Sequence, residues 1–280
     1  MSAHTFVPDG RPAGESIARA THMGIVAHPD DLEILAYPGI LECLGKDDRW
    51  FFGVVATDGR GSARSGPYAA VTDAAMRVIR REEQEKAAVV GEYAAVVMLD
   101  RTSADVQGAG RAGLVAELTD LLRAAGPEIV YTHSLADRHP THVSVALATV
   151  AACRALPERD RPARVLGGEV WGDLEWLTAG DKVAMDVSGR ESIGAALLGV
   201  FDSQIAGGKR YDLAVPARRL AHATYHDSHS VDASTALCLA MDLTPLVQDP
   251  AASVAMYVQE RIDRFAADVR ARIERLERGR

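Results

Sequence analysis

The sequence has few aromatic residues, few cysteines and no long apolar run. Phe, Trp and Tyr make up only 5% of its 280 residues, which disfavours a surface that stacks nucleic-acid bases. Cys43, Cys153 and Cys238 form no CxxC pair and stand among apolar neighbours, as buried free thiols do in a reducing compartment. Because no stretch has the pattern of a signal peptide or a membrane span, we expect a cytoplasmic protein without membrane association.

Positive charge is also scarce. The 31 Lys and Arg residues are outnumbered by 39 Asp and Glu residues, which gives a formal net charge of −8. Proteins that bind a phosphate backbone usually carry a basic surface. The one arginine-rich segment, 264–280, also contains Glu274 and Glu277 and is typical of a solvated helix face. We therefore expect no nucleic-acid partner.

The apolar residues form a regular pattern of strands and helices. They amount to 48% of the chain, enough for a sizeable core. Continuous apolar stretches separated by helical patterns predict an α/β fold, a Rossmann-like three-layer sandwich with a mainly parallel sheet. The strands are expected at 22–27, 50–59, 93–100, 128–134, 163–172 and 182–188, and the helices within 31–45, 72–90, 111–125, 139–156, 190–206 and 252–277.

The same pattern suggests how the chain is divided. Residues 1–20 are rich in Pro and Gly, so we expect a loose N-terminal lead-in. Residues 21–206 hold the alternating elements and form the predicted Rossmann-like catalytic domain. Residues 207–280 are expected to be a small C-terminal extension packed on the same domain.

Polar residues follow the predicted strands at the points where the strands end. The stretch GIVAHPDDLEI changes from apolar residues to His28, Asp30 and Asp31 within a few positions. Asp58 follows the second strand, and the histidine-containing segment 133–142 follows the fourth. Because ligands of an open parallel sheet bind beyond the carboxyl ends of its strands, we expect these side chains to share one edge.

This group has the composition of a catalytic zinc site. Such a site takes three protein ligands and keeps a fourth position for water, and a carboxylate beside it can act as general base. The HPDD segment supplies a histidine ligand, an aspartate ligand and a second aspartate for the base, while HPTH adds two histidines. A dication would also offset the repulsion between the adjacent carboxylates.

Each of these residues also has a simpler interpretation. Asp30 or Asp31 alone can cap the helix that follows, and His139 and His142 can be ordinary histidines near a helix terminus. Their expected meeting at one sheet edge favours a metal site over these separate interpretations.

The same segments resemble a known family. AHPDDLE, followed more than a hundred residues later by DRHPTH, resembles the zinc-dependent de-N-acetylases of the PIG-L/LmbE type. VVATDGRGS, RREEQEKAAVVG and AALLGVFDSQ are similar to the family's strand-two turn, its Arg-x-x-Glu helix and its late Ser-Gln helix. The resemblance covers residues 22–206. It implies a Rossmann-like hydrolase that removes an N-acetyl or other N-acyl group from an amino sugar, such as N-acetylglucosamine, or a glycoconjugate. Since no membrane-anchor segment is seen, the chain resembles the soluble bacterial branch.

The resemblance implies a role for each motif residue. His28, Asp31 and His142 would bind one catalytic Zn²⁺, or another divalent metal. Asp30 would be the general base, and His139 would stabilise the oxyanion or protonate the leaving amine. Further substrate-binding candidates are Arg80, Asp58 and Glu33. Arg80 is also compatible with an exposed helix face, and Glu33 with a helix start. A homo-oligomer is compatible with the resemblance, since relatives often assemble.

Two positions depart from the family pattern. Thr141 stands where relatives often have an aspartate that orients the neighbouring histidine, so the pKa of His139 is open, and Asp137 is a candidate substitute. Asp202 stands in the Ser-Gln motif where a histidine is common.

Other functions are less well supported by the sequence. His222, His226 and His229 are close together and can meet a second metal if their segment is helical, but there is no HExxH. The first strand leads into HPDD rather than GxGxxG, and no GxSxG elbow occurs, so a nucleotide-binding protein and a serine hydrolase are disfavoured. A thiol-conjugate amidase of the same fold and a metal-free Rossmann-like binding protein remain as alternatives.

Overall fold

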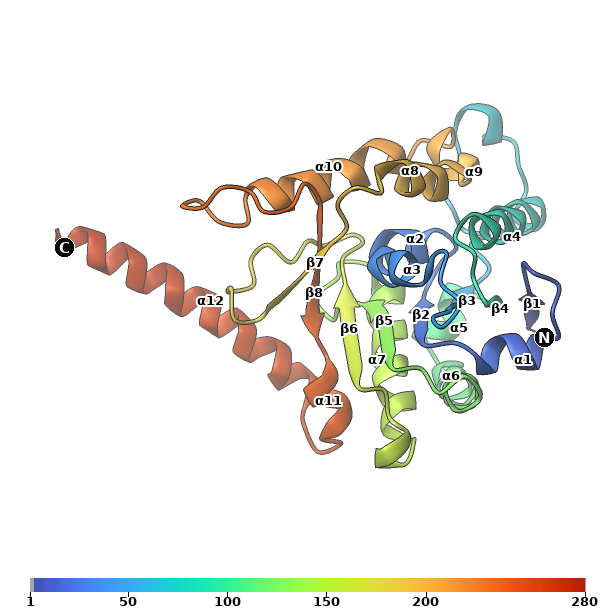
Figure 1. The fold of residues 1–280 in the computed structure, drawn as a ribbon, viewed down its shortest axis with the longest axis horizontal. Helices are drawn as coiled ribbons and strands as arrows, with labels where there is room; N and C mark the ends of the chain where they lie inside the picture. Colours follow the sequence, from blue (N-terminus) through green and yellow to red (C-terminus); the bar gives the residue numbers. More distant parts are fainter. Residues whose placement is uncertain (1–2, 280) are drawn as a thin grey trace.

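The computed structural model describes residues 3–279, which form one mixed sheet covered by helices on both faces (Figure 1). The strand order across the sheet is β1-β4-β3-β2-β5-β6-β8-β7. The five strands from β4 to β6 are parallel, while β1, β8 and β7 pair antiparallel. The predicted α/β fold with a mainly parallel sheet is therefore confirmed. The strands are β1 (His4–Phe6), β2 (His22–Val26), β3 (Phe51–Thr57), β4 (Ala95–Arg101), β5 (Ile129–His133), β6 (Arg164–Gly168), β7 (Lys182–Asp186) and β8 (Leu237–Asp242).

Two hydrophobic cores, one on each face, hold the helices against the sheet. Strands β2 and β3 are buried along their whole length, because alternate side chains enter opposite cores. One face carries α1 (Ala13–Ala18), α5 (Ser103–Gln107), α6 (Arg111–Ala125), α7 (Pro140–Arg154) and α11 (Thr244–Gln248). The other carries α2 (Asp31–Leu35), α3 (Tyr37–Cys43), α4 (Asp73–Val90), α8 (Glu191–Gly199), α9 (Asp202–Ile205) and α10 (Tyr211–Thr224).

The N-terminal segment differs from the expectation. Of residues 1–20, the first two lie outside the described residues, but β1 pairs antiparallel with the edge strand β4 and α1 packs beside α6. The loose lead-in was therefore wrong for residues 4–6 and 13–18. Pro8, Gly10 and Pro12 lie between these two elements, while the free edge of β4 supplies hydrogen-bond partners that a sequence pattern does not show.

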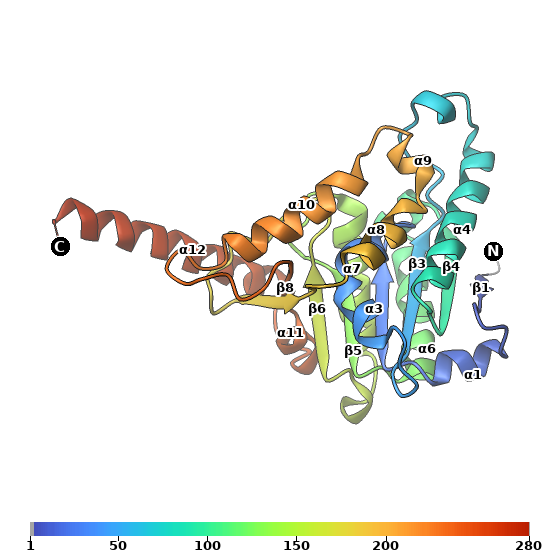
Figure 2. The same ribbon diagram turned by 45° about the horizontal axis from the view of Figure 1, so that its top comes forward.

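The C-terminal segment contributes to the main sheet. Strand β8 inserts between β6 and β7, and α10 packs against it; neither element was predicted. The division of the chain at residue 206 stays a prediction. The last helix, α12 (Val254–Glu277), extends away from the rest of the molecule in both ribbon views (Figures 1 and 2). Among residues 3–279, no helix combines the length and apolarity needed to cross a membrane.

The strand order fixes where a ligand can bind. Strand β2 has β3 on one side and β5 on the other. The chain runs from β2 through β3 to β4 in one direction across the sheet, and then crosses back to β5 and continues to β6 in the other direction. A crevice opens at such a switch point beyond the carboxyl ends of the strands. The HPDD loop follows β2 and the segment 133–142 follows β5, so both predicted motifs lie at this crevice.

Candidate metal and catalytic site

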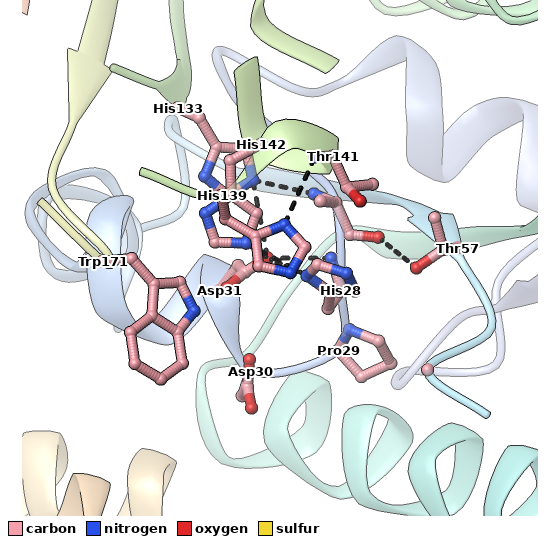
Figure 3. A network of polar contacts seen from close by, with 12 residues as sticks. His28, Pro29, Asp30, Asp31, Thr57, His133, His139, Thr141, His142 and Trp171 are labelled. Atoms are coloured by element: carbon pink, nitrogen blue, oxygen red, sulfur yellow. Dashed lines mark hydrogen bonds and ion pairs between the residues drawn. The ribbon is translucent and has the colours of Figure 1, made fainter. Parts of the chain in front are cut away.

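Three of the predicted metal ligands come together at the crevice (Figure 3). His28 Nδ1 lies 3.2 Å from Asp31 Oδ2 and 3.1 Å from His142 Nε2, and the last two atoms are 3.4 Å apart. Ligands about 2.0–2.1 Å from one tetrahedral ion are separated by about 3.3–3.4 Å. The three atoms therefore have the mutual spacing that one small divalent ion requires.

The electrostatics of these groups suit a cation as well. Burial would raise the pKa of Asp31, but His142, His133 and His28 hold that pKa far below its usual value. Burial would lower the pKa of His142, yet Asp31 and Asp137 raise it. A buried carboxylate that faces several imidazoles is a donor set that zinc and similar ions accept. The residues present thus fit a metal ion.

Asp137 orients one of the ligands. Its carboxylate lies 3.3 Å from His142 Nδ1 and accepts the backbone N–H of His139 at 2.8 Å. A carboxylate beside Nδ1 leaves Nε2 free to bind a metal. Such a carboxylate is the usual outer support of a histidine ligand. We expected Asp137 to replace the aspartate that relatives often have at position 141 and to orient His139. In the structure Asp137 faces the ring of His142 and contacts only the backbone of His139.

His133, at the end of β5, is a fourth histidine of the site; it is fully buried and was assigned no role from the sequence. Its ring stacks on His142 with centroids 3.9 Å apart, and its Nε2 lies 3.5 Å from Asp31 Oδ2. That Nε2 already accepts the backbone N–H of Ala27 at 2.8 Å, so its lone pair is occupied. Burial, followed by the nearby His142, lowers the pKa of His133 well below its usual value. A neutral packing histidine accounts for these contacts better than a ligand does.

Asp30 has an unusual backbone and a buried carboxylate. Its φ of 92° is in the left-handed region, which costs a non-glycine residue about 1–3 kcal/mol and recurs at functional sites. Although it stands at the N-cap of α2, its side chain makes no capping hydrogen bond. Instead Arg80 Nη2 donates to Asp30 Oδ2 at 3.2 Å and to the carbonyl of Pro29. Burial raises the pKa of Asp30 to about 8 despite the opposing charge of Arg80.

A buried network beneath the loop supports Asp30. Gln84 Oε1 accepts the backbone N–H of Asp30 at 3.2 Å, and Gln84 Nε2 donates to Glu33 at 2.8 Å. Tyr93 donates to the same Glu33 oxygen at 2.7 Å. Glu33 has no accessible surface and does not line the cavity. Its contact with substrate stays a prediction, and in this structure Glu33 holds the loop.

His139 caps α7 and faces the cavity. Its Nδ1 accepts the backbone N–H of Thr141 at 3.2 Å, which leaves the proton of the neutral ring on Nε2. Burial and the neighbouring His142 and His28 lower the pKa of His139. Thr141 itself accepts from Gln107 at 2.8 Å. The ring is therefore a neutral donor beside His28 and His142.

The site opens into a cavity of about 300 Å³. Asp58 lies in its wall and binds Arg60, whose Nε donates to Asp58 Oδ2 at 2.6 Å. On the other side Trp171 is 38% exposed, and Lys209 Nζ lies 4.7 Å from its ring centroid. Trp171 and Lys209 belong to no motif, so sequence reasoning missed them. The predicted residues that line the cavity are His28, Asp30, Asp31, Asp58, Arg80 and His139.

The weaker motifs of the sequence also meet in space. Glu83, from the Arg-x-x-Glu helix, accepts both the backbone N–H and the hydroxyl of Ser203 at 2.6 Å. Gln204, the next residue of the Ser-Gln motif, lines the cavity. The two motifs therefore fix α9 against α4, beside Asp30 and Arg80.

The second histidine group does not form a metal site. His222 is buried and its Nε2 lies 2.9 Å from Glu169 Oε2. Helix α10 ends at Thr224, so His226 and His229 lie on an exposed segment without the helical spacing. Among the described residues, the groups that place three ligand atoms within 4.8 Å of one another are His28 with His139 and His142, and Asp31 with His133 and His142.

A protein-family comparison matches the part of the chain that contains the site residues. The family model PIG-L, described as GlcNAc-PI de-N-acetylase, matches residues 23–153, the part that holds both motifs. Because this match includes both motifs, it confirms the resemblance inferred from HPDD and HPTH. None of the curated proteins compared with the chain matches its sequence.

Several solved structures share the fold of this chain. The conserved protein TT1542 from Thermus thermophilus has a TM-score of 0.62 and 17% identity over 84% of this chain and 100% of its own. The 4-carboxy-2-hydroxymuconate hydratase GalB from Pseudomonas putida KT2440 has a TM-score of 0.62 and 18% identity over 80% and 95%. N,N′-diacetylchitobiose deacetylase from Pyrococcus horikoshii has a TM-score of 0.58 and 17% identity over 79% and 84%.

Proposed function

We propose that this protein is a hydrolase that removes an N-acetyl or other N-acyl group from an amino sugar or glycoconjugate. The match of residues 23–153 to the PIG-L family model supports de-N-acetylase chemistry. The single observation that carries the proposal is the mutual spacing of His28 Nδ1, Asp31 Oδ2 and His142 Nε2, 3.1–3.4 Å. These three residues would hold one divalent ion, with zinc the first choice.

The ion would supply Lewis-acid chemistry, polarising an amide carbonyl and lowering the pKa of water. Asp30 is proposed to accept a proton from the attacking water as the new C–O bond forms. His139 would donate from Nε2 to the developing oxyanion. The proton held by Asp30 then passes to the amide nitrogen, the C–N bond breaks, and a carboxylic acid and an amine leave.

The cavity wall favours a sugar as the substrate. The partly exposed ring of Trp171 offers an apolar face on which a pyranose ring can lie. The cavity lining also includes the paired Asp58 and Arg60, which present acceptors and donors suited to sugar hydroxyls. The amide would then lie between these residues, where His28, Asp30 and His139 face the cavity.

The deciding experiment measures acetate release from a panel of N-acetylated amino sugars, before and after removal of metal with a chelator. We expect release that stops on chelation and returns when Zn²⁺ or another divalent ion is added. A second panel, of thiol-bearing amino sugars that carry acyl groups larger than acetyl, tests the thiol-conjugate amidase alternative. An amidase of that kind would release the larger acid from this panel and little acetate from the first. Purified protein without bound metal and without any acid release would support a binding protein.

The fold alone does not select this chemistry. A protein described as a hydratase shares it at a TM-score of 0.62. The assay therefore needs an Asp30→Asn control, in which acid release should fall if the proposed general base is correct.

A further inference from the structure

The helix α12 leaves the body of the protein with most of its length uncovered (Figures 1 and 2). Its first turns are anchored: Arg264 binds Asp181 with N–O distances of 2.6 and 2.7 Å, and Phe265 meets the edge of Trp176. Within the described chain, no side-chain hydrogen bond or ion pair joins residues 266–279 to any other element. The anchored face therefore continues into solvent.

That face is apolar along its whole length. Successive apolar residues are spaced by four, three, four, four and three positions, and at 100° per residue they fall within an arc of about 80°. Four of its residues are exposed: Phe265 at 39%, Ile262 at 42%, Ile273 at 53% and Leu276 at 66%. The stripe consists of Val258, Ile262, Phe265, Val269, Ile273 and Leu276.

A projecting helix with such a stripe needs a partner. Helices that lack tertiary packing are marginal in water, and a contiguous apolar surface on a soluble protein usually marks an interface. The near-heptad spacing is the pattern by which two helices pack along a common seam.

We propose that α12 packs antiparallel against α12 of a second copy of this chain, in a two-fold pair centred between Arg270 and Ala271. In this register Phe265 of one copy faces Leu276 of the other, and Val269 lies level with Arg272 and beside Ile273. On the flank of the stripe, Asp268 of each copy lies two positions, about 3 Å along the axis, from the level of Arg275 of the other, within reach of that long side chain. The same surface on the two copies thus places apolar positions against apolar ones and an acidic position near a basic one, as a two-fold interface requires.

Charge distinguishes this register from the alternatives. A pair centred on Ala267 would overlap more of the stripe, but it would place Asp268 against Asp268 and Arg261 against Arg275. A parallel pair would bring Arg272 of both copies together in the seam. In the proposed register Arg272 covers Val269 with its aliphatic stem, while its guanidinium stays bound to Asp268 at 2.6 Å.

The contact is modest in size. Residues 262–277 form about 24 Å of helix. A contact along one face of so short a stretch buries less than the roughly 800 Å² that each partner contributes to a standard interface. We therefore expect a dimer that dissociates on dilution. Sedimentation velocity of the full chain over a wide concentration range should show a monomer–dimer equilibrium. A monomer at every concentration would overturn the proposal.

The stripe is tested by Leu276→Glu. This substitution should weaken dimerisation at least tenfold while leaving acid release and circular dichroism unchanged, because the residue lies far from the cavity and is exposed. The matched control is Val78→Glu, which puts the same charge on a similarly exposed apolar residue of α4. Equal effects of the two substitutions on dimerisation would contradict the role of α12.

The register is tested by exchanging charges. Arg275→Asp alone should weaken the dimer, because Asp268 then lies near an aspartate. Adding Asp268→Arg to the same chain should restore it, since the pair is re-formed with opposite signs. Failure of the double variant to recover would exclude the proposed register.

The orientation is tested by disulfide cross-linking. Under mild oxidation, Phe265→Cys and Leu276→Cys should cross-link only when the two proteins are mixed, because each residue faces the other type in an antiparallel pair. Cross-linking of either variant with itself would indicate a parallel pair instead. Binding of a monomeric chain to anionic phospholipid vesicles, lost in Leu276→Glu, would assign the stripe to a membrane surface and overturn the proposal.

Discussion

His28 Nδ1 and His142 Nε2 lie 3.1 Å apart, although 114 positions separate the two residues in the chain. One follows β2 and the other lies in the first turn of α7, after β5, so the parallel pairing of β2 and β5 brings them together. Two imidazole lone pairs at this distance repel each other unless a proton or a cation lies between them. With Asp31 as the third group, a metal ion satisfies all three.

Replacing one of these ligands should therefore remove the metal. For His142→Ala we expect loss of bound metal in the purified protein, measured by elemental analysis, together with loss of acid release. The substitution removes one of three donors whose spacing matches a single ion. The matched control is His226→Ala, which removes an exposed histidine outside the site and should leave the metal content unchanged. Retention of a full metal equivalent in His142→Ala would exclude this residue as a ligand.

Asp30→Asn should separate catalysis from metal binding. The carboxylate of Asp30 faces Arg80 and is not within the three-atom group, so the metal content should stay near that of the parent protein. Acid release should fall about 10²–10⁴-fold if Asp30 is the general base. The measurement is kcat with a saturating N-acetylated substrate, alongside metal analysis of the same sample. Unchanged kcat would end this assignment.

Much of the fold could be predicted because local patterns and packing agree. The parallel strands from β2 to β6 are continuous apolar stretches, and α6 ends at Gly126 and Pro127 as its breaker residues indicate. Strands β1 and β8 could not be found in this way. Each is stabilised by pairing with a strand far away in the sequence, and short edge or inserted strands carry little pattern of their own.

The site could be predicted where a motif marks it and not elsewhere. HPDD and HPTH contain the side chains that meet at the crevice, and strand ends alone place them on one edge. Trp171 and Lys209 reach the same region from segments without a motif, so only the three-dimensional structure shows them. Arg80 and Glu33 were expected to contact substrate, but their contacts depend on burial, which a sequence motif does not specify.

Arg80 should act by positioning Asp30. Its Nη2 donates to both the carboxylate of Asp30 and the carbonyl of Pro29, and the ammonium of Lys stands one bond closer to the backbone, so it does not reproduce both contacts. Arg80→Lys should therefore lower kcat about 10–100-fold, as the loss of outer support commonly does, with little change in KM. In the Asp30→Asn background the same substitution should have little further effect, because residues that act as a unit are not additive. Additive losses would show that Arg80 has a separate role.

Trp171 should determine how well the cavity holds a sugar. For Trp171→Ala we expect KM to rise about tenfold with kcat nearly unchanged, because an aromatic face in contact with the substrate is lost away from the reacting atoms. The contact to Asp137 comes from the backbone N–H of Trp171, at 3.1 Å, so the substitution leaves the orientation of His142 intact. Trp171→Phe should recover most of the affinity by restoring an aromatic face. If instead both variants keep the parent KM, the sugar does not lie on this ring, and the wall formed by Asp58 and Arg60 would have to carry recognition alone.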